Sequence, residues 1–94
     1  MTIDERVRIQ ISVTGRVQGV FFRRAAAQQA RALDITGWAR NLEDGSVEIV
    51  GEGKRQNLQS LLAWAQKGPP HARVDAVQVR WEPCVGEFAQ FRVR

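Results

Sequence analysis

The sequence has few of the side chains that build disulfide frameworks, metal sites or nucleophilic triads: one cysteine, one histidine and no tyrosine. Because Cys84 stands alone, no internal disulfide can form, and a lone thiol is more typical of the cytoplasm than of secreted proteins. His71 follows two prolines in an expected loop and lacks a partner for nucleophilic catalysis, which favours a surface histidine. No cluster of His, Cys and carboxylate residues has metal-ligand spacing, so we expect neither a metal nor another cofactor.

Long hydrophobic runs are also missing. No stretch approaches the roughly 18 apolar residues that indicate a membrane-spanning helix. The first six residues are polar and charged, and they lack the apolar core of a signal peptide. We therefore expect a cytoplasmic protein with no membrane partner. A length of 94 residues suits one small domain over residues 1–94, and we expect that domain to be a monomer.

Positive charge is in surplus, with 14 Lys and Arg residues against 10 Asp and Glu residues. Most of the basic residues are arginine, which binds phosphate and carboxylate groups through two parallel hydrogen bonds. A solvated basic surface explains most of them. The surplus still indicates an anionic partner, which could be a small phosphate, a nucleic acid or an acidic protein.

Hydrophobic periodicity predicts six or seven elements along the chain. Alternating apolar residues indicate strands, and apolar residues at helical spacing indicate amphipathic helices. The predicted order is a strand over 7–13, a helix over 22–33, strands over 36–42 and 46–51, a helix over 58–65, a strand over 77–81 and a short strand over 91–93. Asp44-Gly45 between the two middle strands is a strong hairpin signal. This order predicts a ferredoxin-like α+β fold, with two helices on one face of an antiparallel sheet.

Two glycines, Gly15 and Gly19, bracket the segment between the first strand and the first helix. Glycine permits left-handed backbone conformations, and successive N–H groups in such a loop can converge on an anion. The helix that follows adds its free N-terminal N–H groups and the positive end of its dipole. An ordinary strand-to-helix turn explains the two glycines equally well when they are taken alone.

Arg23 favours the anion site. It lies in the first turn of the predicted helix, where a positive charge opposes the helix dipole by roughly 0.3–1 kcal/mol. Helical side chains lean back over the preceding turn, so the guanidinium is expected to point toward the loop. A bound oxyanion would remove the conflict. Arg24, the next residue, is expected at the surface.

The segment Val-Thr-Gly-Arg-Val-Gln-Gly-Val-Phe-Phe-Arg at 13–23 resembles the first motif of the acylphosphatase family throughout. The segment Gly-Trp-Ala-Arg-Asn-Leu-Glu-Asp-Gly-Ser-Val at 37–47, with Gly53 beyond it, resembles the second motif. Both motifs are long and stand in the family's order. The resemblance covers essentially the whole chain and is least diagnostic from Glu82 onward.

The resemblance implies an enzyme that hydrolyses acyl phosphates to a carboxylate and inorganic phosphate, with inorganic phosphate also acting as an inhibitor. It implies that Arg23 and the glycine loop hold the phosphate, and that Asn41 positions the attacking water. The loop residues implied are Gly15, Arg16, Val17, Gln18, Gly19 and Val20.

The chemistry of an acyl phosphate fits this short inventory of side chains. Its carboxylate leaving group has a pKa near ~4.3 and departs without a proton, so no general acid is required. Phosphoryl transfer depends mainly on positioning and on electrostatic stabilisation of the phosphate oxygens. A backbone cradle and one arginine can supply both, and a carboxamide such as that of Asn41 can orient water.

Two other interpretations remain open at this stage. A basic ferredoxin-like sheet can bind RNA by stacking bases on aromatic residues of its central strands, but the expected central positions are Ile9, Ile11, Val47 and Ile49. Nucleic acid is therefore an unlikely partner. Modules that resemble this family also occur inside larger proteins that process carbamoyl phosphate, whereas a chain of 94 residues favours a free-standing hydrolase.

Overall fold

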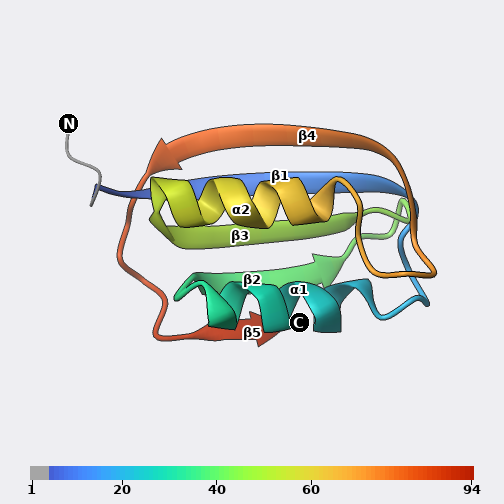
Figure 1. Ribbon diagram of the computed structural model, residues 1–94, viewed down its shortest axis with the longest axis horizontal. Helices are drawn as coiled ribbons and strands as arrows, with labels where there is room; N and C mark the ends of the chain where they lie inside the picture. Colours follow the sequence, from blue (N-terminus) through green and yellow to red (C-terminus); the bar gives the residue numbers. More distant parts are fainter. Residues whose placement is uncertain (1–4) are drawn as a thin grey trace.

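The computed structural model describes residues 5–94 and contains a five-stranded sheet with both helices on one face (Figure 1). The elements are β1 (Arg6–Arg16), α1 (Phe22–Ala32), β2 (Thr36–Asn41), β3 (Val47–Lys54), α2 (Arg55–Ala65), β4 (Arg73–Pro83) and β5 (Phe91–Val93). The predicted ferredoxin-like α+β fold is confirmed, and every predicted element is present. Neither described helix is long and apolar enough to cross a membrane.

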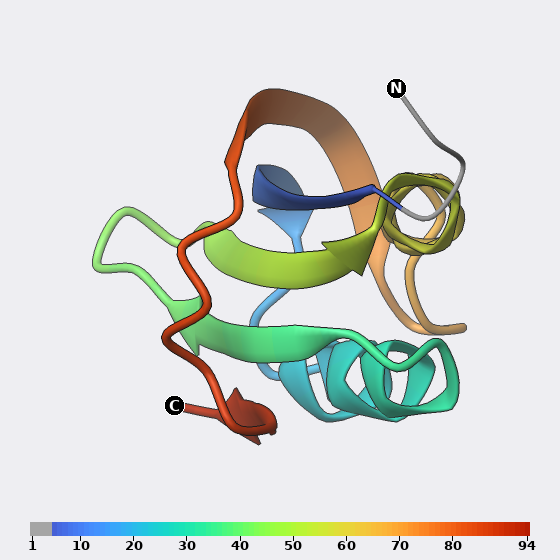
Figure 2. The ribbon, with the colours of Figure 1, turned by 90° about the vertical axis from the view of Figure 1, so that its left-hand side faces the viewer.

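The strands lie in the order β4-β1-β3-β2-β5. The pairs β1–β4, β1–β3 and β2–β3 are antiparallel, as expected for this fold. The short strand β5 is parallel to β2, so the sheet as a whole is mixed. Because β4 and β5 run in opposite directions, the segment between them needs only to pass along one end of the sheet, from the β4 edge to the β5 edge (Figure 2).

The core lies between the sheet and the two helices. Ile9, Ile11 and Val13 alternate along β1 on the face toward the helices, and all three are fully buried. Each such side chain stabilises the fold by roughly 1.5–3 kcal/mol relative to an exposed one. Across the core, the ring of Phe22 in α1 lies 5.2 Å from the ring of Trp64 in α2, which packs the two helices against each other.

The opposite face of the sheet is polar. The isoleucines considered above for RNA stacking point toward the helices instead, because side chains alternate between the two faces of a strand. The open face of β1 and β3 therefore carries the residues at the alternate positions of each strand, such as Gln10, Ser12 and Glu48. Gln10 donates a hydrogen bond of 2.7 Å to Glu48. Neither β1 nor β3 presents an aromatic side chain there, which disfavours base stacking on these two strands, whereas Trp38 of β2 lies on this face with the guanidinium of Arg40 over its ring.

Candidate active site

β1 ends in a bulge that starts the glycine loop. The register between β1 and β4 shifts between Thr14 and Gly15, where the backbone of Gly15 has a φ of 128°. A Cβ atom at this position would collide with the carbonyl oxygen of Arg73 on β4. Glycine is therefore required at residue 15, both for its positive φ and for the close approach of the two strands.

The loop that follows β1 is fixed to the core through two valines. Val17 and Val20 are 1% and 7% exposed, although the loop itself lies at the surface. Arg16, which precedes Val17, and Gly19, which lies between the two valines in the sequence, are exposed. The two buried valines therefore fix the loop backbone on the side that faces the core, while its other side faces solvent.

The backbone N–H groups of this loop have no hydrogen-bond partner among the residues that the structure describes. From Val17 to Phe21, not one main-chain N–H donates a hydrogen bond to any residue among 5–94. Gly19 and Phe21 have φ angles of 76° and 63°, so two residues of this segment have a left-handed backbone conformation. Such alternation turns successive N–H groups toward a common concave side, which is the usual arrangement of an anion-binding nest.

The N-terminus of α1 adjoins the same loop and lacks a cap. No side chain among the described residues caps the helix, and its first turn contains no acidic residue. The first N–H groups of an α-helix have no intrahelical acceptor, and the positive end of the dipole lies there. Loop and helix together therefore present a surface of free donors suited to an oxyanion.

Gln18 ties the loop to the β2–β3 hairpin. Its side-chain amide donates hydrogen bonds of 2.8 Å to the carbonyl oxygen of Leu42 and 3.0 Å to that of Ser46. The sequence motif includes Gln18, but its spacing does not reveal this contact. The bonds bring the two motifs together, because Leu42 directly follows Asn41.

The hairpin itself is closed by Asp44. Its carboxylate accepts hydrogen bonds of 2.6 Å from the hydroxyl of Ser46 and 3.0 Å from the backbone N–H of that residue. These bonds stabilise the charged form and lower the pKa of Asp44, the hydroxyl contributing most. Glu43 is exposed at the turn. Both residues are turn residues, as predicted.

Asn41 is the last residue of β2, and its side chain is exposed. It lies opposite Val47 and shares the helix-facing register of Ala39, which places it on the same side of the sheet as α1. Its amide makes no hydrogen bond with any residue that the structure describes. An asparagine that braced the hairpin would form a hydrogen bond within it, and Asn41 forms none with the described residues.

Arg23 makes a contact that the sequence did not predict. Its Nη1 donates a hydrogen bond of 2.6 Å to the main-chain oxygen of Arg94. Arg94 is placed there because its own N–H donates to the carbonyl oxygen of Ala39 in β2, at 2.8 Å. The guanidinium is thus held between α1 and the residue that follows β5. Arg24 is exposed, as predicted.

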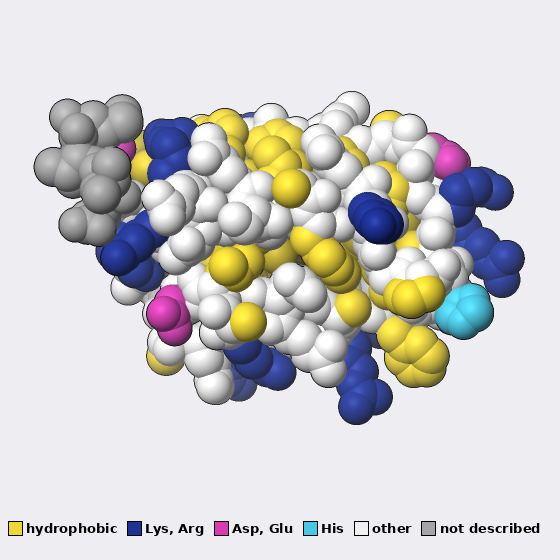
Figure 3. All heavy atoms as spheres, viewed as in Figure 1, with side chains coloured by type: hydrophobic (Ala, Val, Ile, Leu, Met, Phe, Trp, Pro, Cys, Tyr) yellow, Lys and Arg dark blue, Asp and Glu magenta, His cyan; other side chains and the backbone are white. Residues whose placement is uncertain are grey.

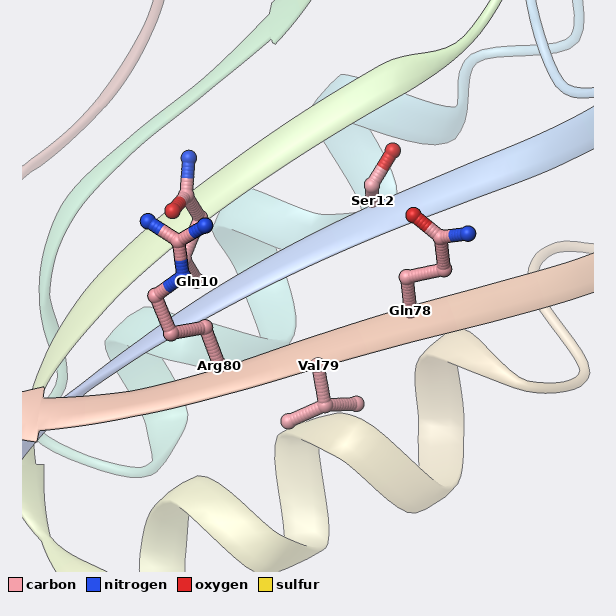
Figure 4. Close-up of a pocket in the computed structure, with 5 residues that line it drawn as sticks. All are labelled: Gln10, Ser12, Gln78, Val79 and Arg80. Carbon is pink, nitrogen blue, oxygen red and sulfur yellow. The ribbon is translucent and has the colours of Figure 1, made fainter.

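The remaining candidate residues do not belong to the loop or to the hairpin. His71 is exposed after Pro69-Pro70, as predicted, and Cys84 is half-buried beside Glu52. Within residues 5–94, no group of three or more His, Cys, Asp or Glu side chains could hold a metal ion. A cavity of about 220 Å³ lies on the open face of the sheet, lined by Gln10, Ser12, Gln78, Val79 and Arg80 (Figure 4). None of its residues belongs to the loop or the hairpin.

Comparison with known proteins gives consistent results. The sequence profile described as Acylphosphatase matches residues 9–93. An acylphosphatase of Methylococcus capsulatus is 50% identical over 86 residues, which cover 92% of this chain and 94% of that protein.

Solved structures agree with this assignment. The structure of an acylphosphatase from Coxiella burnetii superposes with a TM-score of 0.89 at 41% identity, over the full length of both chains. HypF of T. kodakarensis also matches, with a TM-score of 0.80 at 30% identity, but this chain covers only 12% of that protein. The profile and the relatives of equal length decide the assignment. The chain belongs to the acylphosphatase family.

Proposed function

We propose that this acylphosphatase hydrolyses the carboxyl–phosphate bond of acyl phosphates without a metal ion, using the loop from Gly15 to Val20, Arg23 and Asn41. The observation that carries the proposal is the run of loop N–H groups from Val17 to Phe21, which lack acceptors among residues 5–94. Exposed backbone N–H groups can also donate hydrogen bonds to water. In this loop, however, the backbone is fixed by buried side chains and its donors adjoin the uncapped N-terminus of α1, an arrangement that suits an oxyanion.

Arg23 would supply the charge that neutral N–H groups lack. A guanidinium carries five N–H donors, and among residues 5–94 only the Nη1 bond to Arg94 uses one of them. That bond would hold the planar group in one orientation while the remaining donors bind two phosphate oxygens. Because the transition state spreads charge over the phosphate oxygens, fixed donors stabilise it more than mobile water does.

Asn41 would orient the attacking water. Its exposed amide offers one oxygen as an acceptor and two N–H donors, and all of them are free of partners in the described chain. The bond from Gln18 to Leu42 fixes the adjacent backbone relative to the loop. A water bonded to Asn41 would therefore keep a constant position relative to the bound phosphate.

The reaction would balance without a general acid. Water attacks phosphorus, the bond between phosphorus and the acyl oxygen breaks, and its electron pair leaves with the carboxylate. The proton of the attacking water passes to an oxygen of the phosphate product. A carboxylate with a pKa near ~4.3 needs no proton to leave, whereas an alkoxide does.

The test is the hydrolysis of acetyl phosphate with excess EDTA, compared with hydrolysis of glycerol phosphate, which has an alkoxide leaving group. We expect the first reaction to persist in EDTA and the second to be undetectable. Arg23→Ala should reduce acetyl phosphate hydrolysis strongly, whereas Arg24→Ala, a neighbouring surface control, should not. Loss of activity in EDTA that magnesium restores would overturn the metal-independent mechanism.

A further inference from the structure

Phe21 combines two features that are unfavourable in a folded protein. Its backbone is left-handed, with a φ of 63°, a conformation that bulky residues rarely adopt. Its side chain is 73% exposed, the highest among the exposed large hydrophobic side chains. Those others are Val79, Val85 and Val93, none of which lies in the loop.

The left-handed backbone has an explanation in the loop itself. Phe21 is the N-terminal flanking residue of α1, and its N–H is the last of the unpartnered series that begins at Val17. A left-handed residue there turns the N–H groups toward a common side. Glycine would adopt this conformation without steric cost, as Gly19 does two residues earlier. The conformation therefore does not explain the phenylalanine.

Packing does not explain it either. The neighbours Val20 and Phe22 are buried, and they fix the backbone on both sides of Phe21. The Phe21 ring projects between them into solvent, where it gains almost nothing from the core. Figure 3 shows hydrophobic side chains exposed at this end of the molecule, close to the histidine and to several basic side chains. A strained backbone and an exposed apolar ring occur together at the edge of the candidate site. This combination indicates that the ring contacts another molecule, not the rest of the chain.

We propose that the Phe21 ring contacts the acyl group of the substrate and gives the enzyme a preference for acyl phosphates with aromatic or other bulky apolar acyl groups. This inference rests on the proposed function of the loop. If the loop N–H groups and Arg23 take the phosphate oxygens, the acyl group must project out of the cradle toward solvent. Phe21 stands at that rim, and an aromatic ring offers a large, rigid apolar surface for it.

The experiment compares kcat/KM for benzoyl phosphate with kcat/KM for acetyl phosphate in each variant. Damage to the cradle lowers both values alike and cancels in their ratio, whereas loss of an acyl contact lowers the ratio. We expect Phe21→Ala and Phe21→Gly to reduce the ratio about tenfold, and Phe21→Leu to retain most of it. Val85→Ala, which shortens a side chain that is 64% exposed outside the site, is the matched control and should leave the ratio unchanged.

A melting curve for each variant shows that the comparison concerns folded protein, and Phe21→Gly should melt at a higher temperature because its backbone strain is removed. A ratio of the two kcat/KM values that is unchanged in both Phe21→Ala and Phe21→Gly would overturn the inference. The ring would then have to contact something other than the acyl group, such as a protein partner. Failure of the wild-type protein to hydrolyse either substrate would overturn the proposed function, and this inference with it.

Discussion

A positive charge in the first turn of a helix opposes the helix dipole, and Arg23 occupies such a position in α1. The structure offers partial compensation through the main-chain oxygen of Arg94, 2.6 Å from Nη1. This contact uses one of the five N–H donors of the guanidinium, and the others make no hydrogen bond to residues 5–94. The remaining donors could bind a phosphate, which supports the proposed place of Arg23 in the phosphate site.

Replacing Arg23 separates its binding role from its structural role. Arg23→Ala should weaken competitive inhibition by inorganic phosphate at least about tenfold, because a charge-assisted bidentate contact is lost. Arg23→Lys should behave similarly, since an ammonium group cannot bind two oxygens in one plane. The free energy of unfolding should change by less than about 1 kcal/mol, because removal of the unfavourable charge offsets loss of the Arg94 bond. Wild-type phosphate inhibition in Arg23→Ala would locate the anion site elsewhere.

Asn41 should act on turnover and not on folding. Its amide makes no hydrogen bond to residues 5–94, so Asn41→Ala should leave the melting temperature and phosphate inhibition near their wild-type values. If the amide orients water, kcat should fall at least about a hundredfold, because water positioning matters more in the transition state than in the ground state. Asn41→Asp should also be nearly inactive, since its carboxylate repels the phosphate. A folded Asn41→Ala protein with most of its turnover would exclude the assigned role.

Between elements, the decisive contact is the one from the loop to the hairpin. Gln18 bonds two carbonyl oxygens, those of Leu42 and Ser46, on the two sides of the turn. These carbonyls bracket the turn that follows Asn41, so one side chain fixes the distance between the candidate phosphate site and the candidate water site. We therefore expect Gln18 to act as a positioning residue, through Asn41 and the loop backbone.

Gln18→Ala should lower stability by roughly 1–2 kcal/mol, because two part-buried hydrogen bonds are lost. It should lower kcat more than it weakens phosphate inhibition, because the loop keeps its anchors Val17 and Val20 while the hairpin moves relative to it. Urea unfolding and phosphate inhibition kinetics measure the two effects. Gln28→Ala, a change at an exposed residue of α1, is the matched control. Equal losses in kcat and in phosphate affinity would instead indicate collapse of the loop itself.

Across the whole molecule, the last residues of the chain reach from one edge of the sheet to the other. The segment after β4 passes the strand ends opposite the loop and then forms β5 beside β2 (Figure 2). Glu52, which is only 1% exposed, holds this segment through hydrogen bonds of 2.7 Å from the N–H of Val85 and 3.0 Å from that of Gly86. Arg8 lies 3.6 Å from the same carboxylate. The hydrogen bonds between Glu52 and this segment therefore help to place Arg94, farther along the chain, against Arg23.

Glu52 should make stability depend on pH. Burial by itself raises the pKa of Glu52, but the N–H bonds from Val85 and Gly86, the Cys84 thiol and the charge of Arg8 outweigh it and hold the pKa below 4.5. A lowered pKa means stability that is present above 4.5 and is lost as the pH falls through the folded-state value. Glu52→Gln should therefore be less stable than wild type by roughly 1–3 kcal/mol at pH 7.

The difference between wild type and Glu52→Gln should shrink as the pH falls below 4.5, because protonation of the carboxylate removes the contribution of its charged form. Urea unfolding at intervals of half a pH unit measures it, with Glu43→Gln as a control for an exposed acidic residue. A difference that stayed constant from pH 7 to pH 3 would contradict the proposed contribution of the charged form.

The sequence alone determined the order and type of the elements and the residues of both motifs. Period-2 alternation in β1, helical spacing in α1 and α2, and Asp44-Gly45 in the hairpin are local signals, because backbone geometry within a few residues decides them. The glycine loop was predicted for the same reason, since the demand for positive φ at Gly15 and Gly19 is carried by the residue itself.

Only the tertiary structure decided which distant groups meet. Arg23 and Arg94 are separated by 71 residues, Gln18 and Leu42 by 24, and Glu52 and Val85 by 33. The parallel pairing of β5 with β2 and the burial of Glu52 belong to the same class. Such contacts depend on how the sheet is ordered and where a connecting segment crosses it, and no periodicity in the chain encodes that. Local propensity selects the elements, whereas the free energy of packing them together selects their partners.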